Sequence, residues 1–76
     1  MVNHLKDVVT IDVDRLKALR DAHQYSISDL SIRLGYKTPS GYWLIEKGER
    51  KVTINILYLL AQIYNCNMED LLKQAN

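Results

Sequence analysis

The sequence predicts an all-α fold, a compact bundle of five short helices, and three observations support this prediction. Apolar residues recur three and four positions apart, which places them along one side of a helix. A residue that can cap a helix (Asp, Ser, Thr or Asn) stands before each expected helix. The stretch at residues 8–11 is β-branched, but it is too short to stand alone as a sheet. It is expected to be extended chain or an edge strand added to a partner.

The first two helices are defined by their caps. Asp12 precedes a helix expected from Val13 to about His23, with apolar residues on one side. Ser26 precedes a second helix expected over Ile27–Leu34. Gly35 ends this helix, because glycine turns the chain with a positive φ at no steric cost.

A third helix follows after only a few residues. Thr38 is its expected cap, the helix is expected over residues 39–47, and Gly48 is its expected left-handed C-terminal residue. Tyr42 and Ile45 are its expected core positions. Two short helices joined by so tight a turn must cross steeply, as in a helix-turn-helix. The second helix of such a pair is the shape that enters a DNA major groove.

Two more helices complete the bundle. The fourth begins after Thr53 and ends at Asn65, which tolerates the left-handed conformation. Its expected inward face comprises Ile54, Leu57, Leu60, Ala61 and Tyr64. The fifth is capped by Asn67, and Leu71 and Leu72 are expected to point back to the core.

Length and composition indicate one small domain. The 76 residues divide into an expected N-terminal arm, residues 1–11, and a helical domain, residues 12–76, which leaves no material for a catalytic second domain. The longest apolar run, Ile56–Ala61, is too short to span a membrane. Met1–Asp7 lacks the apolar core of a secretory signal. The single Cys66 excludes an internal disulfide, which fits a reducing cytoplasm.

The charges are unevenly distributed although the net charge is only +1. Residues 33–51 hold more basic than acidic side chains: Arg33, Lys37, Lys47, Arg50 and Lys51 against Glu46 and Glu49. This distribution is interpreted either as a basic surface around the turn or as a solvated face that happens to be basic.

Several positions together resemble one family. They are Arg20, the segment SISDLSIRLG at residues 26–35 and the segment IEKG at residues 45–48, followed by a capped apolar helix pair. Over Val13–Leu72 the chain resembles the Cro and phage-repressor, or Xre-type, helix-turn-helix family. In that family the helix before the turn carries a leucine, a small residue and a glycine, matched here by Leu30, Ser31 and Gly35.

The resemblance implies a lambda-repressor-like bundle and a sequence-specific regulator of transcription. Such a protein, expected to be a repressor, binds double-stranded DNA at a palindromic operator as a homodimer. It also implies a cytoplasmic, nucleoid-associated protein encoded by a bacterium or phage. No small-molecule effector is evident, and a switch would lie in another protein, in competition at the operator or in degradation.

The resemblance assigns roles to individual residues. Arg20 and Glu46 are expected to form a structural ion pair that ties two helices together and does not touch DNA. The base-contacting residues would be Lys37, Thr38, Ser40, Gly41 and Leu44. The phosphate-contacting residues would be Ser26, Ser28, Trp43, Lys47, Arg50 and Lys51. Family members tend to carry Gln, Asn, Arg or Lys where this chain has Ser40 and Leu44, so direct readout is expected to be sparse.

Trp43 is unexpected on the exposed side of a helix. One interpretation is that its ring covers the end of the core against Arg50 or Lys51. A second is that it lies along the DNA backbone and donates its indole N–H to a phosphate. A third is that it marks a protein interface.

Apolar residues cover more than one face of the fourth and fifth helices. They are Tyr58, Leu59, Ile63, Tyr64, Met68 and Leu72. These side chains are expected either to pack in the core or, for part of them, to form the homodimer interface. Dimerisation would offset modest affinity per domain, because two recognition helices read two half-sites.

Other chemistry is not indicated by the sequence. His4, His23 and Cys66 are too few and too scattered for a zinc site, and no catalytic grouping or phosphate-binding loop is present. No metal, cofactor or enzymatic activity is therefore expected. A second function remains open, a protein-interaction module of the antirepressor or antitoxin kind. It would use Tyr42, Trp43 and Leu44 as an apolar docking face.

Overall fold

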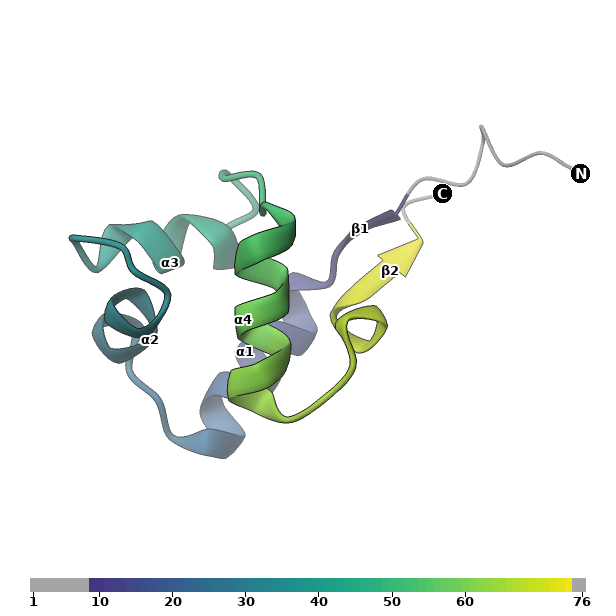
Figure 1. Cartoon of the computed structure of the whole chain (residues 1–76), viewed down its shortest axis with the longest axis horizontal. Coiled ribbons are helices and arrows are strands. Elements are labelled where there is room, and N and C mark those ends of the chain that lie inside the picture. The colour runs from purple at the N-terminus through teal and green to yellow at the C-terminus, as the bar shows by residue number, and fades with distance from the viewer. Residues whose placement is uncertain (1–8, 75–76) are drawn as a thin grey trace, which may run out of the picture.

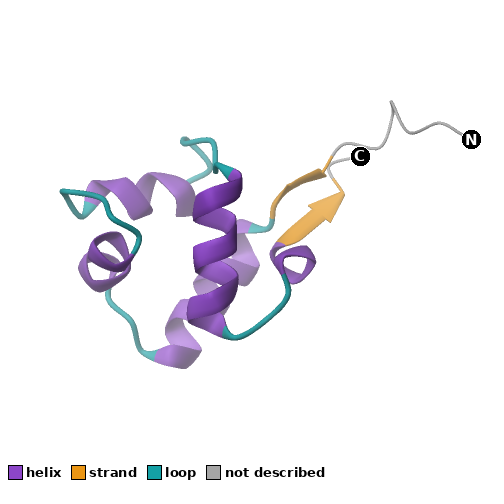
Figure 2. Ribbon diagram, in the orientation of Figure 1, coloured by secondary structure: helices purple, strands orange, loops and turns teal. Residues whose placement is uncertain are grey.

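The computed structural model describes residues 9–74, which form a helical body and a short two-stranded ribbon (Figures 1 and 2). The elements in chain order are β1 Val9–Ile11, α1 Val13–His23, α2 Ile27–Arg33, α3 Ser40–Glu46, α4 Ile54–Tyr64, the 3-10 helix η2 Met68–Leu71 and β2 Leu72–Gln74. In Figure 1, α1 and α4 lie at the centre of the body, α2 and α3 lie on one side, and the ribbon extends from the other.

The five-helix, all-α prediction is wrong in two respects. The segment expected as a fifth helix is a single 3-10 turn, η2, so the described chain contains four α-helices. In addition, β1 pairs with β2 in an antiparallel sheet, with Val9 opposite Gln74 and Ile11 opposite Leu72. The β-branched stretch thus finds its partner in its own chain, because η2 brings residues 72–74 alongside it. Of the expected N-terminal arm, residues 1–8 lie outside the described residues.

Three of the predicted N-caps are confirmed. In each one the side-chain oxygen accepts a hydrogen bond from the backbone N–H three residues later, at 3.1 Å for Asp12, 3.0 Å for Ser26 and 3.2 Å for Thr53. These bonds satisfy amide groups that have no partner inside their helix. The starts of α1, α2 and α4 are therefore fixed by local chemistry.

The predicted cap of α3 is wrong. Thr38 makes no cap bond; its hydroxyl lies 2.8 Å from the Ser40 hydroxyl. Pro39 already has a helical backbone conformation, and no side chain caps α3. The first turn of α3 is instead held from the neighbouring helix, as described below.

The predicted helix ends are confirmed at three positions with positive φ. These are Gly35 at 90°, Gly48 at 74° and Asn65 at 55°. Gln24, with φ 59°, ends α1 in the same way, although its residue type gave no signal. The left-handed residues let the chain reverse direction between short helices.

The core lies between α1, α2, α3 and α4, and η2 closes one end of it. Its buried apolar residues are Leu16, Leu30, Leu34, Tyr42, Ile45, Leu60, Ala61, Tyr64 and Leu71. Two expected core positions are wrong. Ile54 is 78% exposed because it stands at the first turn of α4, beyond the core. Leu72 is only half-buried because it begins β2.

Two tyrosine hydroxyls lie inside this core. Within the described chain, neither the Tyr42 hydroxyl nor the Tyr64 hydroxyl has a hydrogen-bond partner. Burial raises the pKa of Tyr64 from 10.0 to about 12. Burial, followed by the nearby Glu46, raises the pKa of Tyr42 well above its ordinary value. Both phenols are therefore held neutral by the fold.

The raised pKa of Tyr64 predicts alkaline sensitivity. Above pH 10 the unfolded chain loses this proton while the folded protein retains it, so stability falls as the pH rises from about 10 towards 12. The free energy of unfolding, measured in urea at pH about 8 and about 11, should fall less in Tyr64→Phe than in the wild type. Tyr58→Phe, at an exposed tyrosine, is the matched control. An equal loss in wild type and Tyr64→Phe would contradict the prediction.

Candidate nucleic-acid interface

The bend expected at Gly35 is present. Figure 1 shows α2 almost end-on while α3 runs across the view, so the two helices cross steeply. The Gly35 N–H donates to the Ile32 carbonyl at 3.0 Å, and the Tyr36 N–H donates to the Ser31 carbonyl at 2.9 Å. These bonds close the C-terminus of α2 and turn the chain into the connection that leads to α3.

Ser31 joins α2 to the start of α3. Its side chain is completely buried, and its hydroxyl donates to the Pro39 carbonyl at 2.8 Å and accepts from the Tyr42 N–H at 3.0 Å. The sequence indicated a small residue here, which permits close approach. It did not reveal the two hydrogen bonds, which take the place of the missing cap on α3.

Arg20 and Glu46 form the expected structural ion pair. The Arg20 guanidinium donates two hydrogen bonds to the Glu46 carboxylate, at 2.7 and 3.2 Å, and so joins α1 to the end of α3. Glu46 is only 4% exposed. Its hydrogen bond raises the pKa of Arg20 above the usual value. A bidentate pair of this kind fixes orientation as well as distance.

The expected base-contacting residues divide into two groups. Lys37, Thr38 and Ser40 are exposed at the turn and the start of α3, and Leu44 is half-buried one turn further on. Gly41 is buried, and a Cβ atom placed on it would lie 2.3 Å from Cγ of Tyr36. The Tyr36 ring covers Gly41, so this residue is not available to a base edge. It is left out of the proposed contacts.

The expected phosphate-contacting residues all reach the surface. The polar and charged side chains among them are exposed: Ser26, Ser28, Lys47, Arg50 and Lys51. The hydroxyl of Ser26 already accepts the cap bond of α2. These residues lie at the start of α2, at the end of α3 and in the loop that follows it, so they flank the outer side of the motif.

Trp43 is 47% exposed on the outer side of α3. The cation over its ring is Lys47, whose Nζ lies 4.2 Å from the ring centroid. Arg50, which one interpretation expected there, lies over the Tyr36 ring instead, 5.0 Å from its centroid. About half of the Trp43 surface stays open to a ligand, and the role of its ring stays a prediction.

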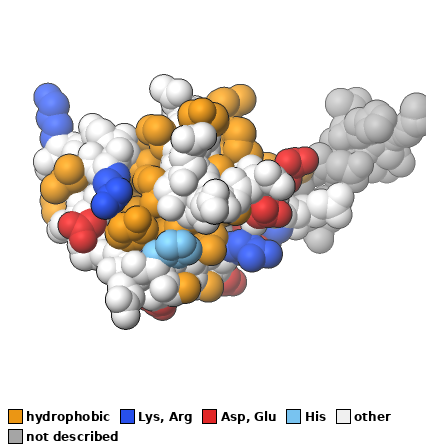
Figure 3. Space-filling view, turned by 60° about the horizontal axis from the view of Figure 1, so that its bottom comes forward, with side chains coloured by type: hydrophobic (Ala, Val, Ile, Leu, Met, Phe, Trp, Pro, Cys, Tyr) orange, Lys and Arg blue, Asp and Glu red, His pale blue; other side chains and the backbone are white. Residues whose placement is uncertain are grey.

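An acidic side chain competes within this basic region. Lys47 Nζ lies 3.5 Å from an Oε of Glu49. On the face shown in Figure 3, Lys and Arg side chains are scattered singly, with hydrophobic side chains between them. Within the motif, Lys47 is thus paired with its neighbour Glu49, and the net charge of the whole chain is only +1.

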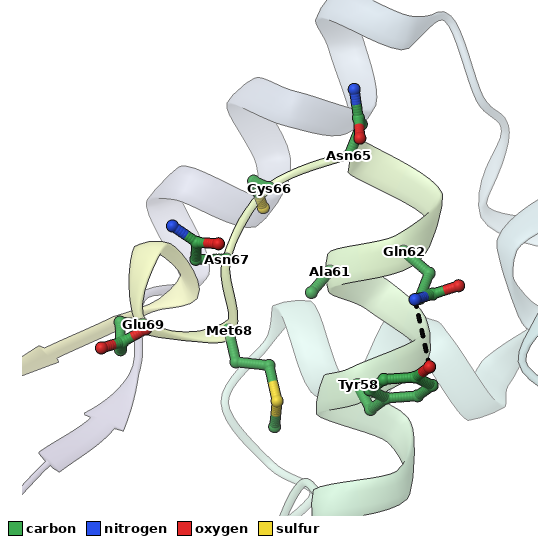
Figure 4. A pocket seen from close by; sticks show the side chains of 8 residues that line it. All are labelled: Tyr58, Ala61, Gln62, Asn65, Cys66, Asn67, Met68 and Glu69. Carbon is green, nitrogen blue, oxygen red and sulfur yellow. Dashed lines mark hydrogen bonds between the residues drawn. The ribbon is translucent and has the colours of Figure 1, made fainter.

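The expected dimer-forming residues lie on α4, η2 and β2. Tyr58 is 51% exposed, and Leu59, Ile63, Met68 and Leu72 are half-buried, whereas Tyr64 is a core residue. Tyr58 and Met68 line a surface hollow of about 410 Å³ between α4 and the chain that follows it (Figure 4). The Gln62 amide donates to the Tyr58 hydroxyl at 3.1 Å beside this hollow.

Two features of other functional classes are absent from residues 9–74. No group of three or more His, Cys, Asp or Glu side chains in this range is arranged to hold a metal ion. None of the helices in the same range has the length and apolar character needed to cross a membrane.

Comparison with known proteins identifies the family. Residues 16–71 match the helix-turn-helix family, and the chain therefore belongs to the Xre-type helix-turn-helix proteins. A relative from Pyrococcus abyssi (strain GE5 / Orsay) is 38% identical over 68 residues. Its name gives it provisionally as an HTH-type transcriptional regulatory protein. The alignment covers 90% of this chain but only 20% of that relative, so the chain spans about a fifth of the relative's length.

The sequence interpretation missed the aromatic residues that hold cations beside the motif. Arg33 lies over the Tyr25 ring, 4.9 Å from its centroid, in addition to the Arg50 and Tyr36 pair. The sequence held one signal for the contact between Tyr36 and Gly41. Gly41 lies inside a helix, where glycine is unfavourable unless another group approaches closely.

Replacing Ser31 tests the junction between α2 and α3. Ser31→Ala leaves the Pro39 carbonyl and the Tyr42 N–H without their partner, so the free energy of unfolding should fall by about 1–3 kcal/mol. Ser28→Ala, in the same helix but exposed, should change it by less than about 0.5 kcal/mol. Urea denaturation followed by circular dichroism measures both. Equal stability of the two variants would show that the junction does not depend on these bonds.

Proposed function

We propose that this chain is a sequence-specific DNA-binding domain of a transcription regulator, a repressor that inserts α3 into the major groove. The observation that carries the proposal is the two-sided character of α3. Tyr42 and Ile45 are buried on its inner side. In the turn before α3 and at its first residue, the exposed side chains are Lys37, Thr38 and Ser40. Family membership supports the same assignment, since the second helix of this motif is the one that reads DNA.

The proposed contacts are of two kinds: some side chains read bases, and others bind phosphates and so position the domain on DNA. Lys37, Thr38, Ser40 and Leu44 would meet base edges, where Ser and Thr accept either kind of partner and Leu packs on a thymine methyl group. The proposed phosphate contacts are Ser26, Ser28, Trp43, Lys47, Arg50 and Lys51. Few of the base-contacting side chains discriminate strongly, so the specificity and affinity of one domain are modest.

A homodimer on a palindromic operator would make up for this modest affinity. Two copies of α3 placed one DNA turn apart would read two half-sites. The proposed interface is the apolar surface of α4, η2 and β2, formed by Tyr58, Leu59, Ile63, Met68 and Leu72. We further propose that the chain acts in the cytoplasm without a cofactor or catalytic step, and that it represses by occupying the operator.

A second candidate function rests on the exposure of Trp43. An indole that is 47% exposed beside the half-buried Leu44 is also suited to docking on a protein, as in an antirepressor or antitoxin-like module. Tyr42, which was expected to share this face, is completely buried and takes no part in it. The two functions differ in their dependence on the basic residues that follow α3.

Selection of bound duplexes from random DNA, at two salt concentrations, tests the proposed function. An inverted repeat should be enriched, because each copy of α3 reads one half-site. The variant Arg50→Ala/Lys51→Ala should bind all duplexes more weakly and with a salt slope lowered by up to about 2, since two phosphate contacts are lost. Ser40→Ala should change the selected sequence.

The docking function predicts the opposite pattern. No sequence would be enriched, Arg50→Ala/Lys51→Ala would leave partner binding almost intact, and Trp43→Ala would abolish it. Absence of any enriched sequence at either salt concentration would overturn the DNA-reading function.

Glu49 provides a separate test of the basic region. Glu49→Gln removes the carboxylate that pairs with Lys47, so DNA binding should tighten by about two- to fivefold at low salt, and less at high salt. Asp14→Asn, at an exposed carboxylate in α1 outside the helix-turn-helix, is the matched control. Fluorescence anisotropy of a labelled duplex measures both. Weaker binding by Glu49→Gln would mean that Lys47 does not face phosphate.

A further inference from the structure

Cation–aromatic pairs gather around the helix-turn-helix. The described chain has three of them within residues 25–50: Arg33 over Tyr25, Lys47 over Trp43, and Arg50 over Tyr36. Two of the three cations, Lys47 and Arg50, are among the proposed phosphate contacts.

The Tyr36 ring is held firmly on the backbone of α3. Tyr36 is half-buried, and a Cβ atom on Gly41 would come within 2.3 to 2.7 Å of three of its side-chain carbons. Only glycine leaves room for the tyrosine at this place. The close contact fixes one side of the Tyr36 side chain against the first turn of α3.

The head group of Arg50 lies over an aromatic ring that comes before α3 in the chain. Arg50 follows α3 in sequence, but its guanidinium carbon is 5.0 Å from the Tyr36 ring centroid. Because Tyr36 also packs against Gly41, its side chain links the Arg50 head group to the first turn of α3. Arg50 forms no ion pair with any carboxylate in the described chain, whereas Lys47 is paired with Glu49.

We infer that Tyr36 is a positioning residue for DNA binding: packed against Gly41, it holds the Arg50 guanidinium over its ring for contact with a DNA phosphate. The inference rests on the proposed function. A long cationic side chain loses rotational freedom when it binds, and a ring that already restrains it lowers that cost. The planar guanidinium can stack on the ring while its N–H groups stay free for an anion.

Binding to a 30-base-pair duplex of arbitrary sequence, at low salt, tests this arrangement, because phosphate contact needs no particular sequence. Tyr36→Leu should bind about two- to tenfold more weakly. Arg50→Ala should bind more weakly with a salt slope lowered by about 1. The double variant should match Arg50→Ala, because the tyrosine acts through the arginine. Tyr36→Phe keeps the ring and Lys17→Ala removes an exposed cation from α1, and both should bind like the wild type.

A second measurement separates positioning from folding. The Arg50 Nε–H group should be ordered on the nanosecond timescale in ¹⁵N relaxation of the DNA-free wild type, and mobile in Tyr36→Leu. Backbone spectra of the same samples show whether α3 is intact. If Tyr36→Leu does not fold, Arg50→Lys replaces it: this variant keeps the charge but stacks less well, and it should bind more weakly with an unchanged salt slope.

The outcomes separate this inference from the proposed function. Wild-type affinity in Tyr36→Leu, or effects of Tyr36→Leu and Arg50→Ala that simply add, would overturn the positioning role. Salt-dependent binding without an enriched sequence would overturn the reading function but leave the Tyr36 inference standing. No binding to any duplex by the wild type would overturn both.

Discussion

The structure depends on the close contact between α2 and α3 at Ser31. A larger side chain would push the two helices apart, and an apolar one would leave the Pro39 carbonyl and the Tyr42 N–H without partners. This single hydroxyl both permits the contact and replaces the missing cap of α3. The ion pair between Arg20 and Glu46 then fixes the other end of α3 to α1. Held at both ends, α3 presents its outer side in one orientation.

The fixed orientation of α3 matters because the chain carries little excess positive charge for binding DNA phosphates. With a net charge of +1, it cannot rely on a broad basic surface. Three of the cations in residues 33–51 instead lie over aromatic rings, and one of them, Lys47, also pairs with Glu49. In the proposed function, placement of individual side chains, more than total charge, governs affinity for DNA. Pairing of two copies on one operator would supply the affinity that a single domain lacks.

The sequence predicted the helix boundaries and the turn, which depend on residues that are neighbours in the chain. The capping residues predicted the starts of α1, α2 and α4, Asn65 predicted the end of α4, and Gly35 predicted the bend after α2. The sheet was not predictable, because β1 and β2 are three residues each and only tertiary contacts bring them together. The exclusion of Gly41 from the surface and the position of the Arg50 head group depend on Tyr36, and no periodicity in the sequence links these three residues. The roles of the exposed residues at α3 remain predictions.

The central claim is that the outer side of α3 is the surface that meets DNA. Titration of the ¹⁵N-labelled protein with the selected duplex, followed by amide chemical shifts, tests this claim most directly. The largest changes are predicted at Lys37, Ser40 and Leu44, with smaller ones where α2 begins. Changes confined to α4 and η2, with those three amides unmoved, would contradict the claim.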